Sequence, residues 1–419
     1  MANTLFSLFS TVFLLSALLV FSSSTEASPF DYDKGVALRQ TILVMKWPSN
    51  FTGNGVAEKS FGMSETRSRL WSSVDTGYGR VNAAIESKAF FISSSETGAG
   101  SFGSGGSLLG QSRPLKHWDW TTKHLNDEST AIESRIDRLD AVFHVGIYDI
   151  DIGRQPLSMG TSHFVGVLDV VAPFAPGDLD ATYKPGVDAV RVRRGIGMTG
   201  EAEIIAVGAD EWSDGALLGR TRASFGMFDV EVIGGRFRRR GFGGIGWEGG
   251  SNPIGFWGEA ALFGRREEQE SVRSGWSEAA FSGVTGLDYY IQPDFVVGGG
   301  VLYQDFGVRD PEDLPEVYNE APFREGWVFL GSAGYGVLTL SKELHPLVQA
   351  DVSGLVNLVD SSTLWQPVVT INTGDNTDIS FYGWIATGKD TKTDGGTVET
   401  RSEFGMMPDG GGLYARWFF

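Results

Sequence analysis

Charged side chains that could act together are concentrated between residues 188 and 232, in two successive pairs of alternating segments. Side chains in a β-strand alternate between its two faces, and residues directly opposite each other in an antiparallel pair share a face. Arginines would therefore face carboxylates on one side of each hairpin, with apolar residues on the other side. The charged residues are Arg191, Arg193, Glu201, Glu203, Arg220, Arg222, Asp229 and Glu231.

Opposed arginine and carboxylate groups perform no covalent chemistry by themselves, but they create an electric field between them. Unit charges about 4 Å apart interact by about 1 kcal/mol in water, and by several times more near protein. Across a narrow aqueous pore, such a field would orient charged or dipolar solutes without trapping them. In a soluble sandwich, the same charged face would simply meet water, and this reading remains an alternative.

Metal and cofactor chemistry finds little support in the sequence. The chain has five histidines, and none has the spacing of a strong metal site. Cysteine is absent, which excludes disulfides, thiol nucleophiles and cysteine-ligated metals. We therefore expect no enzyme, no catalytic residue, no metal and no cofactor. The histidines are His117, His124, His144, His163 and His345.

One short similarity to an enzyme family lies near the second histidine. Residues 117–124, His-Trp-Asp-Trp-Thr-Thr-Lys-His, and residues 46–50, Lys-Trp-Pro-Ser-Asn, faintly resemble the two active-site boxes of secreted T2-type ribonucleases. Val44 stands where the first box has its histidine, and no glycine follows His124. The disulfides of that family are impossible here. Because acid–base cleavage normally needs two placed groups, a ribonuclease-like hydrolase is only a remote alternative.

The composition favours strands and disfavours nucleic-acid binding. The chain has 419 residues, of which 57 are glycine, and 12% are aromatic. This glycine content is about twice the usual share and does not suit a helical protein. The formal charge of -18 argues against a nucleic-acid partner, because polyanions need a basic footprint.

The N-terminus predicts a signal peptide over residues 1–27. Residues 4–20 are the only long apolar run, and Thr25 and Ala27 supply small residues at the two key cleavage positions. No Lys or Arg precedes the run, so the leader looks more like that of a eukaryotic secreted protein. No other stretch is long and apolar enough for a transmembrane helix, and a membrane-spanning fold would have to be built from strands.

The elements that must position the charges are short alternating segments separated by Gly, Asp, Asn and Ser turns. They run from residue 188 to the C-terminus, and an earlier hairpin joins residues 135–145 to 149–157. Residues 28–67 give a mixed signal with at most one strand, and the Gly/Ser-rich residues 94–114 predict a solvated loop. Residues 159–188 contain three prolines and have no clean period. In a barrel, such a loop either covers the mouth or folds into the lumen.

The last strand carries the most specific signal. Ala415, Trp417 and Phe419 share one face of the segment 411–419, and the chain ends on that aromatic residue. This arrangement resembles the closing strand of bacterial outer-membrane β-barrels. The resemblance implies that these three residues form the membrane-insertion signal, which is read by the barrel-assembly machinery.

Three stretches together resemble Gram-negative outer-membrane porin-like channel proteins over about residues 68–419. They are residues 151–160, Asp-Ile-Gly-Arg-Gln-Pro-Leu-Ser-Met-Gly, residues 183–191, Tyr-Lys-Pro-Gly-Val-Asp-Ala-Val-Arg, and the terminal Phe419. The resemblance implies an all-β, antiparallel transmembrane barrel of about 16 strands (range 14–18), with short turns on one side and longer loops on the other. It also implies a passive channel in the outer membrane of a Gram-negative-type cell. Small hydrophilic solutes or ions would pass through it, and lumen charges would set its selectivity.

Several partners follow from this interpretation. We expect membrane lipid around the barrel, and homotrimers are common among porins. Lipopolysaccharide is a candidate partner of the basic cluster Arg236, Arg238, Arg239 and Arg240, which a solvated hairpin end explains equally well.

The acidic residues 310–316 would favour cations at a mouth or simply keep a loop solvated. A plugged structural or adhesin-type barrel is a further alternative, because small or filled barrels do not conduct.

Overall fold

Alternating residues place 66% of the described residues in strands. The computed structural model describes residues 31–47, 60–93, 112–126, 129–176, 182–265, 279–389, 392–394 and 397–419. Apolar residues recur at every second position over runs of 8 to 16 residues, and this period of two forms strands with two different faces. Among the described residues, no helix is long and apolar enough to cross a membrane.

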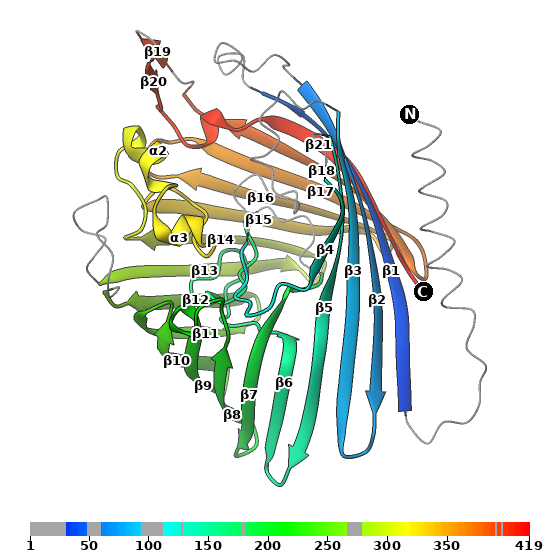
Figure 1. The fold of residues 1–419 in the computed structure, drawn as a ribbon. Coiled ribbons are helices and arrows are strands. Elements are labelled where there is room, and N and C mark those ends of the chain that lie inside the picture. The colour runs from blue at the N-terminus through cyan, green and yellow to red at the C-terminus, as the bar shows by residue number, and fades with distance from the viewer. Residues whose placement is uncertain are drawn as a thin grey trace, which may run out of the picture.

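Eighteen strands form one closed antiparallel barrel (Figure 1). Each strand pairs with its neighbour in sequence, except that β4 (Thr121–Asn126) pairs only with β5 and is an extra strand. The barrel strands are β1 (Asp31–Lys46), β2 (Ser60–Asp75), β3 (Gly79–Ile92), β5 (Thr130–Val145), β6 (Tyr148–Pro156), β7 (Gly186–Ile196), β8 (Gly200–Val207), β9 (Ala216–Phe225), β10 (Phe228–Phe237), β11 (Arg240–Ser251), β12 (Ile254–Phe263), β13 (Ala280–Gln292), β14 (Phe295–Gln304), β15 (Gly334–His345), β16 (Val348–Asn357), β17 (Thr363–Gly374), β18 (Thr377–Thr387) and β21 (Asp409–Phe418).

The last strand closes the barrel. β21 pairs with β18 on one side and with β1 on the other, so that Leu413 lies opposite Ile42 across the seam. The backbone amide of Phe419 also donates to the carbonyl of Val36 at 2.8 Å. Closure therefore gives every barrel strand a partner on both sides. The expected all-β antiparallel barrel is confirmed, with 18 strands against the expected number of about 16.

The two ends of the barrel differ as expected. One end carries tight turns of two or three residues, such as Gly146-Ile147 between β5 and β6. The other end carries the long connections, including residues 157–185 and 305–333. The second of these contains η4 (Pro311–Asp313), α2 (Leu314–Val317) and α3 (Ala321–Arg324). Three small elements complete this end: η3 (Trp212–Asp214), the ribbon β19 (Lys392–Asp394) with β20 (Thr397–Glu399), and η5 (Phe404–Met406).

The N-terminal part differs from the expectation. The boundary expected at residue 68 falls inside β2, and residues 28–67 contribute β1 and half of β2 where we expected at most one strand. The outer face of these strands mixes Gln, Ser and Thr with apolar residues, which hides the period of two. The signal peptide over 1–27 and most of the loop over 94–114 lie outside the described residues.

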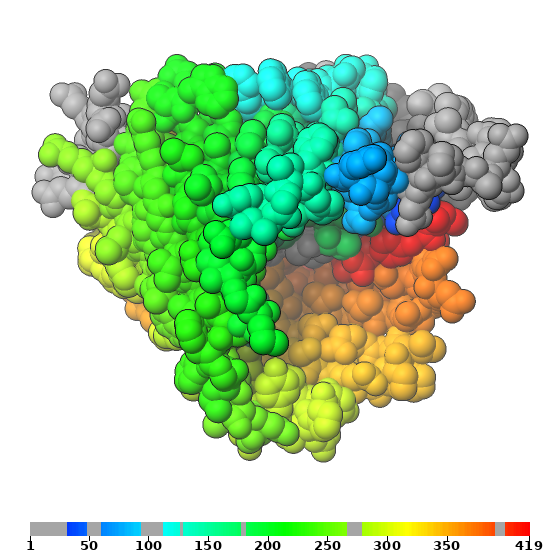
Figure 2. Space-filling model, turned by 90° about the horizontal axis from the view of Figure 1, so that it is seen from below, coloured from blue at the N-terminus to red at the C-terminus, as the bar shows by residue number. Residues whose placement is uncertain are grey.

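The two faces of the sheet differ in chemistry. Apolar side chains stand outward and are largely exposed, for example Ile204 at 60%, Leu287 at 60% and Val301 at 54%. Charged residues, with two apolar clusters, lie on the inner side. Viewed from below Figure 1, the surface is hollowed, and the inner side of the C-terminal strands is visible (Figure 2). The barrel is therefore apolar outside and largely polar inside.

We expect the seam to tolerate no side chain at Gly412. A Cβ atom there would overlap the carbonyl oxygen of Ile42 on β1. Gly412→Val should weaken the β21–β1 pairing by about 1–3 kcal/mol, which is typical of overpacking. The measurement is the urea midpoint of the folded form that migrates faster in unheated gels. The control is Gly219→Val, where the nearest atom to a new Cβ is 3.9 Å away. Equal midpoints for the two variants would contradict the expectation.

Candidate functional site

The charges predicted from the sequence lie on β7 to β10, and five of them form one linked network. Glu203 bonds with Arg191 and Arg220. Glu231 lies 3.6 Å from Arg220 and 3.2 Å from Arg222. Both carboxylate side chains are only 1% exposed, whereas that of Arg222 is 46% exposed. Each buried carboxylate therefore has two guanidinium partners, and Arg222 is the member that solvent reaches.

The other three predicted residues are near this network but outside it. Glu201 lies opposite Arg222 in the strand register, and Arg193 lies opposite Glu203. Asp229 lies opposite Ser224 and is exposed. None of the three forms an ion pair with a residue that the structure describes. The alternation of residues correctly predicted that these side chains share a face with the network. Which of them form ion pairs depends on the distances between the side chains.

A larger charged cluster lies on β1 to β5 and was missed from the sequence. Six cationic and three acidic side chains meet there, so the cluster has an excess of positive charge in a chain whose overall charge is -18. Arg39 lies 2.5 Å from Glu65, and Arg135 lies 2.8 Å from Glu86. The members are Arg39, Glu65, Arg67, Arg69, Glu86, Lys88, Arg135, Asp137 and Arg138. We call this set the cationic wall.

The cationic wall could have been detected in part. Glu65, Arg67 and Arg69 share one parity, which is the signal used further along the chain. This signal was missed because no strands were assigned with certainty to residues 28–67. The residues that pair in the cationic wall are also far apart in sequence. Arg69 pairs at 2.5 Å with Asp137, for example, which is 68 residues away. Only the closed sheet brings such residues together.

An arginine-lined recess of about 330 Å³ opens beside the cationic wall. Arg39, Arg67 and Arg69 lie on one side of it, and Arg416 of β21 completes it. Tyr183, from the connection between β6 and β7, places its ring 4.5 Å from the guanidinium carbon of Arg69. Cation–π contact of this kind holds a planar side chain over the arginine. The connection between β6 and β7 thus reaches the inner wall at this point.

The connection between β6 and β7 folds into the barrel, which is one of the two alternatives expected for residues 159–188. Glu259 on the inner face of β12 holds it through four backbone amides. The amides of Thr161 and Ser162 each donate to Glu259 at 2.6 Å. Those of Val167 and Leu168 donate at 2.6 Å and 3.0 Å. We call the described residues 157–176 the constriction loop.

A second inward segment, residues 327–333, is anchored by another buried carboxylate. Glu403, just before η5, accepts the amide of Gly331 at 2.7 Å and the hydroxyls of Tyr318 and Tyr335 at 2.9 Å and 2.5 Å. Asn357 also donates to it at 2.9 Å. Burial raises the pKa of Glu403 above its ordinary value, while the hydrogen bonds from its neighbours act in the opposite direction.

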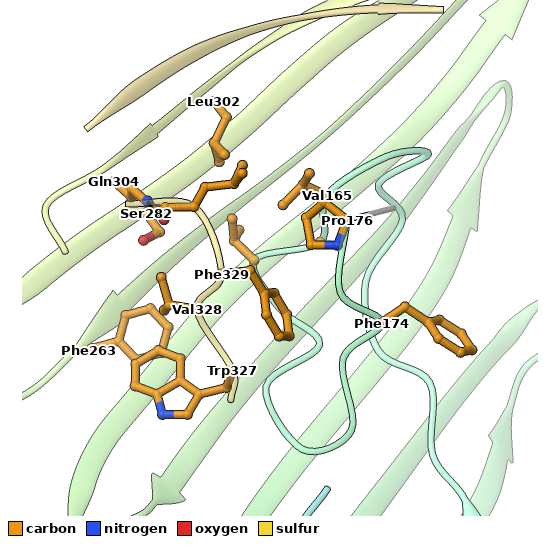
Figure 3. Close-up of a pocket in the computed structure, with 13 residues that line it drawn as sticks. Val165, Phe174, Pro176, Phe263, Ser282, Leu302, Gln304, Trp327, Val328 and Phe329 are labelled. Atoms are coloured by element: carbon orange, nitrogen blue, oxygen red, sulfur yellow. Dashed lines mark hydrogen bonds between the residues drawn. The ribbon is translucent and has the colours of Figure 1, made fainter. Parts of the chain in front are cut away.

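The two inward segments meet around an apolar recess of about 450 Å³ (Figure 3). Val165, Phe174 and Pro176 come from the constriction loop, and Trp327 and Phe329 come from the second segment. Trp327 also packs 5.0 Å from Phe263, centroid to centroid. The narrow part of the lumen therefore has an apolar side in addition to its charged wall.

The remaining candidates occupy the loop end or the outer wall. Arg239 of the basic cluster pairs with Glu211 at 2.5 Å and with Asp214 at 2.8 Å, and Arg238 lies 3.7 Å from Glu325. These arginines are therefore already paired within the protein. In the acidic segment 310–316, Leu314 is buried, and the carboxylates next to it stay accessible.

The two histidines of the ribonuclease-like segment do not converge. The ring of His117 contacts the carbonyl of Ala209 at 2.7 Å, whereas the ring of His124 contacts the hydroxyl of Ser134 at 3.0 Å. Within the described residues, no group of three or more His, Asp or Glu side chains could hold a metal ion.

The terminal residues Ala415, Trp417 and Phe419 have the parity that faces outward. The register partners of Ala415 and Trp417 on β1 are Gln40 and Leu38, which have the same parity as Ile42, whose side chain is 47% exposed. Tyr414 and Arg416, of the opposite parity, point inward, because Tyr414 packs in an inner apolar cluster and Arg416 lines the arginine recess. Phe419 itself is 61% exposed.

These features define a class of protein. A closed 18-stranded barrel with an apolar outer face, a charged inner wall and inward-folded loops has the fold of the outer-membrane porins.

Solved structures of this class match nearly the whole chain. OccAB1 of Acinetobacter baumannii has a TM-score of 0.57 and 8% identity over 93% of this chain and 96% of its own. OccK9 (OpdG) of Pseudomonas aeruginosa has a TM-score of 0.56 and 10% identity over 93% and 98%. OccAB4 of A. baumannii has a TM-score of 0.55 and 9% identity over the same shares. No family model and no curated protein matches the sequence. The fold expected from the porin resemblance is thus confirmed.

We expect Glu259→Gln to loosen the constriction loop without unfolding the barrel. A glutamine has one acceptor oxygen, so about half of the four amide contacts would be lost, at about 1–3 kcal/mol for each buried amide left unpaired. The measurement is the rate at which a protease cuts within residues 157–176 of the folded protein. The matched control is Glu343→Gln, which changes an exposed carboxylate on β15. Equal cutting of both variants would show that Glu259 does not anchor the loop.

Proposed function

We propose that this protein is a passive outer-membrane channel for small hydrophilic solutes or ions. The observation that carries the proposal is the charged inner wall of a closed barrel whose outer face is apolar. Lining a lumen with ion pairs is reasonable only where water enters, because burying charge in a dry interior is costly. We propose no catalytic role and no cofactor.

The location rests on the outer face. Aromatic residues stand at the ends of strands beside the short turns, as Phe225, Phe228 and Tyr289 do, with exposures of 66%, 45% and 51%. Aliphatic residues such as Val232 and Val190 follow further along the strands. This order matches an aromatic girdle beside a lipid-facing band. We propose insertion in the outer membrane of a Gram-negative-type cell after cleavage of residues 1–27 as a signal peptide.

Selectivity is proposed to come from two charged regions. The first is the predicted set on β7 to β10, in which Arg191, Arg220 and Arg222 pair with Glu203 and Glu231, while Arg193, Glu201 and Asp229 lie near that network. The second is the cationic wall, which has three more cations than carboxylates among its described members. A cleft lined by one sign of charge concentrates ions of the other sign. We therefore propose a preference for anionic solutes, although the whole chain is acidic.

A plugged scaffold is the second candidate, and the constriction loop is the observation that favours it. Planar-bilayer recording of the purified protein separates the two. Discrete, stable openings would support the channel, and reversal potentials in a salt gradient would report its ion preference. A folded barrel without conductance would support the plugged scaffold and overturn the channel.

The partners stay proposals of the same kind. Lipid surrounds the barrel, and the assembly machinery reads its last strand. Lipopolysaccharide is a weaker proposal than the sequence suggested, because two arginines of the basic cluster already face carboxylates. These two are Arg238 and Arg239, and the other members of the cluster are Arg236 and Arg240.

We expect Arg193→Gln to shift permeability toward cations. Arg193 stands on the β7 face that carries the network but forms no ion pair with a described residue, so its substitution breaks no ion pair of the network. A charge about 4 Å from the path contributes about 1 kcal/mol, so the anion-to-cation permeability ratio should fall about two- to fivefold. Arg309→Gln, on an exposed loop, is the control. A ratio unchanged in Arg193→Gln but changed in the control would place the selective charges elsewhere.

We expect Phe419→Ala to reduce assembly in cells while leaving the folded barrel almost as stable. The substitution removes an exposed ring and keeps the backbone bonds to Val36. Surface changes of this kind usually alter stability by about 0.5 kcal/mol or less. The two measurements are barrel yield in outer membranes and refolding into detergent. Unchanged yield in cells would remove Phe419 from the insertion signal, and Ile204→Ala controls for loss of an outward apolar side chain.

A further inference from the structure

One histidine of the constriction loop lies against the inner wall of the barrel. Nδ1 of His163 contacts Oδ2 of Asp288 on β13 at 2.9 Å. Leu287 and Tyr289, on either side of Asp288, are exposed on the outer face, so Asp288 points to the inner side. The loop therefore meets the inner wall through a titratable pair, in addition to its four amide bonds to Glu259.

The inner wall is shaped to hold this pair. Asp288 is largely covered, with 11% of its side chain exposed. Its register partner on β14 is Gly298, where a Cβ atom would overlap Oδ1 of Asp288, so the glycine leaves room for the carboxylate. The ring of His163 packs on the indole of Trp257 from β12, with centroids 5.2 Å apart and planes at 33°. Three neighbouring strands thus fix the position of one imidazole.

The other part of the His163 ring is open. Its side chain is 51% exposed, and the constriction loop lies inside a closed barrel, so the exposed part faces the lumen. Asp288 occupies Nδ1, and within the described part of the chain Nε2 has no hydrogen-bond partner. Nε2 is therefore the nitrogen that exchanges a proton with water. The neutral ring can keep its Nδ1–H bond to Asp288, so loss of this proton changes the charge without releasing the ring.

Few other charges surround this ring. Among the described residues, Asp288 is the only charged side chain at ion-pair distance from His163. On β12, Trp257 is uncharged, and the oxygens of Glu259 accept loop amides on both sides of His163. On β14, Gly298 has no side chain. The His163–Asp288 pair therefore has no net charge when the ring is protonated and one negative charge when the ring is neutral.

The other four histidines do not lie on the constriction loop. Two of them precede β5 and one ends β15. The fourth, His144 on β5, lies beside a tight turn and contacts Asp149 at 2.6 Å, with side chains 60% and 44% exposed. That pair has the same chemistry as His163 with Asp288, but salt screens charges at such an exposed place. His144 is therefore a matched reference for His163.

We propose that His163 makes the ion selectivity of the channel depend on pH. The inference rests on the proposed channel function and names a group that would regulate it. With the ring protonated, the neutral pair leaves the anion preference of the cationic wall unopposed. Histidine ordinarily changes its charge between pH 5 and 8. As the pH rises through this range, the pair gains a negative charge in the lumen, which attracts cations and repels anions.

Reversal potentials of the full-length protein in planar bilayers at pH 5 and pH 8 test this inference. The wild-type anion-to-cation permeability ratio should fall about two- to fivefold from pH 5 to pH 8, which is the effect of one charge about 4 Å from the path. His163→Gln removes the titrating ring and should give the low ratio at both pH values. His144→Gln should keep the wild-type pH dependence. An unchanged pH dependence in His163→Gln, or an equal loss in both variants, would overturn the inference.

Asp288→Asn separates the charge of the pair from its structural role. Asparagine keeps an acceptor for Nδ1 of His163 and removes the negative charge. The ratio should keep its pH dependence and be higher at each pH. Its value in Asp288→Asn at pH 8 should match that of the wild type at pH 5, because the pair has no net charge in either case. A merely structural role for His163 predicts no such match, and its absence would overturn the inference.

The wild-type measurement also separates the two proposals. A folded barrel that conducts at neither pH fails the channel and the inference together. Conductance with a ratio that does not change between pH 5 and pH 8 leaves the channel in place and overturns the inference alone. The heat-sensitive gel shift of each variant confirms that it is folded before its ratio is compared.

Discussion

Closure of the sheet through β21 is the constraint on which the rest of the structure depends. Every barrel strand has a hydrogen-bonded neighbour on both sides, and for β1 and β18 the second neighbour is β21. In a lipid environment, an unpaired backbone amide or carbonyl costs several kcal/mol, so a half-closed sheet is not a stable intermediate form of this architecture. Glycine at Gly412 lets β21 and β1 approach at that seam. Once β21 has paired with β1, closure fixes which face of every barrel strand points into the lumen and which points outward.

On the inner surface, buried carboxylates need cationic partners. Carboxylates such as Glu86, Glu203 and Glu231 are almost fully covered, and each is contacted by more than one cation. Because each buried carboxylate has several cationic partners, its loss of hydration is compensated. Some guanidinium groups, such as that of Arg222, still face water. The carboxylates therefore hold the inner wall together, and solvent reaches a cation such as Arg222, whose side chain is 46% exposed.

Carboxylates also hold the two segments that narrow the lumen. Glu259 fixes the constriction loop through backbone amides, and Glu403 fixes residues 327–333 through an amide, two tyrosines and an asparagine. Backbone amides are available in any loop sequence, so a single strand residue can hold an irregular segment. Such anchors explain how these two irregular segments are held on the inner side of the barrel.

The sequence by itself determined the barrel class, the parity of the charged faces and the closing role of the last strand. These are local properties, because a period of two and a terminal aromatic residue need no knowledge of distant neighbours. It did not separate β1 from β2, because polar residues such as Gln40 and Thr66, which lie opposite each other, interrupt the apolar period on their outward faces, nor did it reveal the cationic wall. Only the tertiary structure decided which charges pair and that residues 157–176 turn inward. Those outcomes depend on register between strands far apart in sequence, such as Arg69 with Asp137, and register is set by closure of the whole sheet.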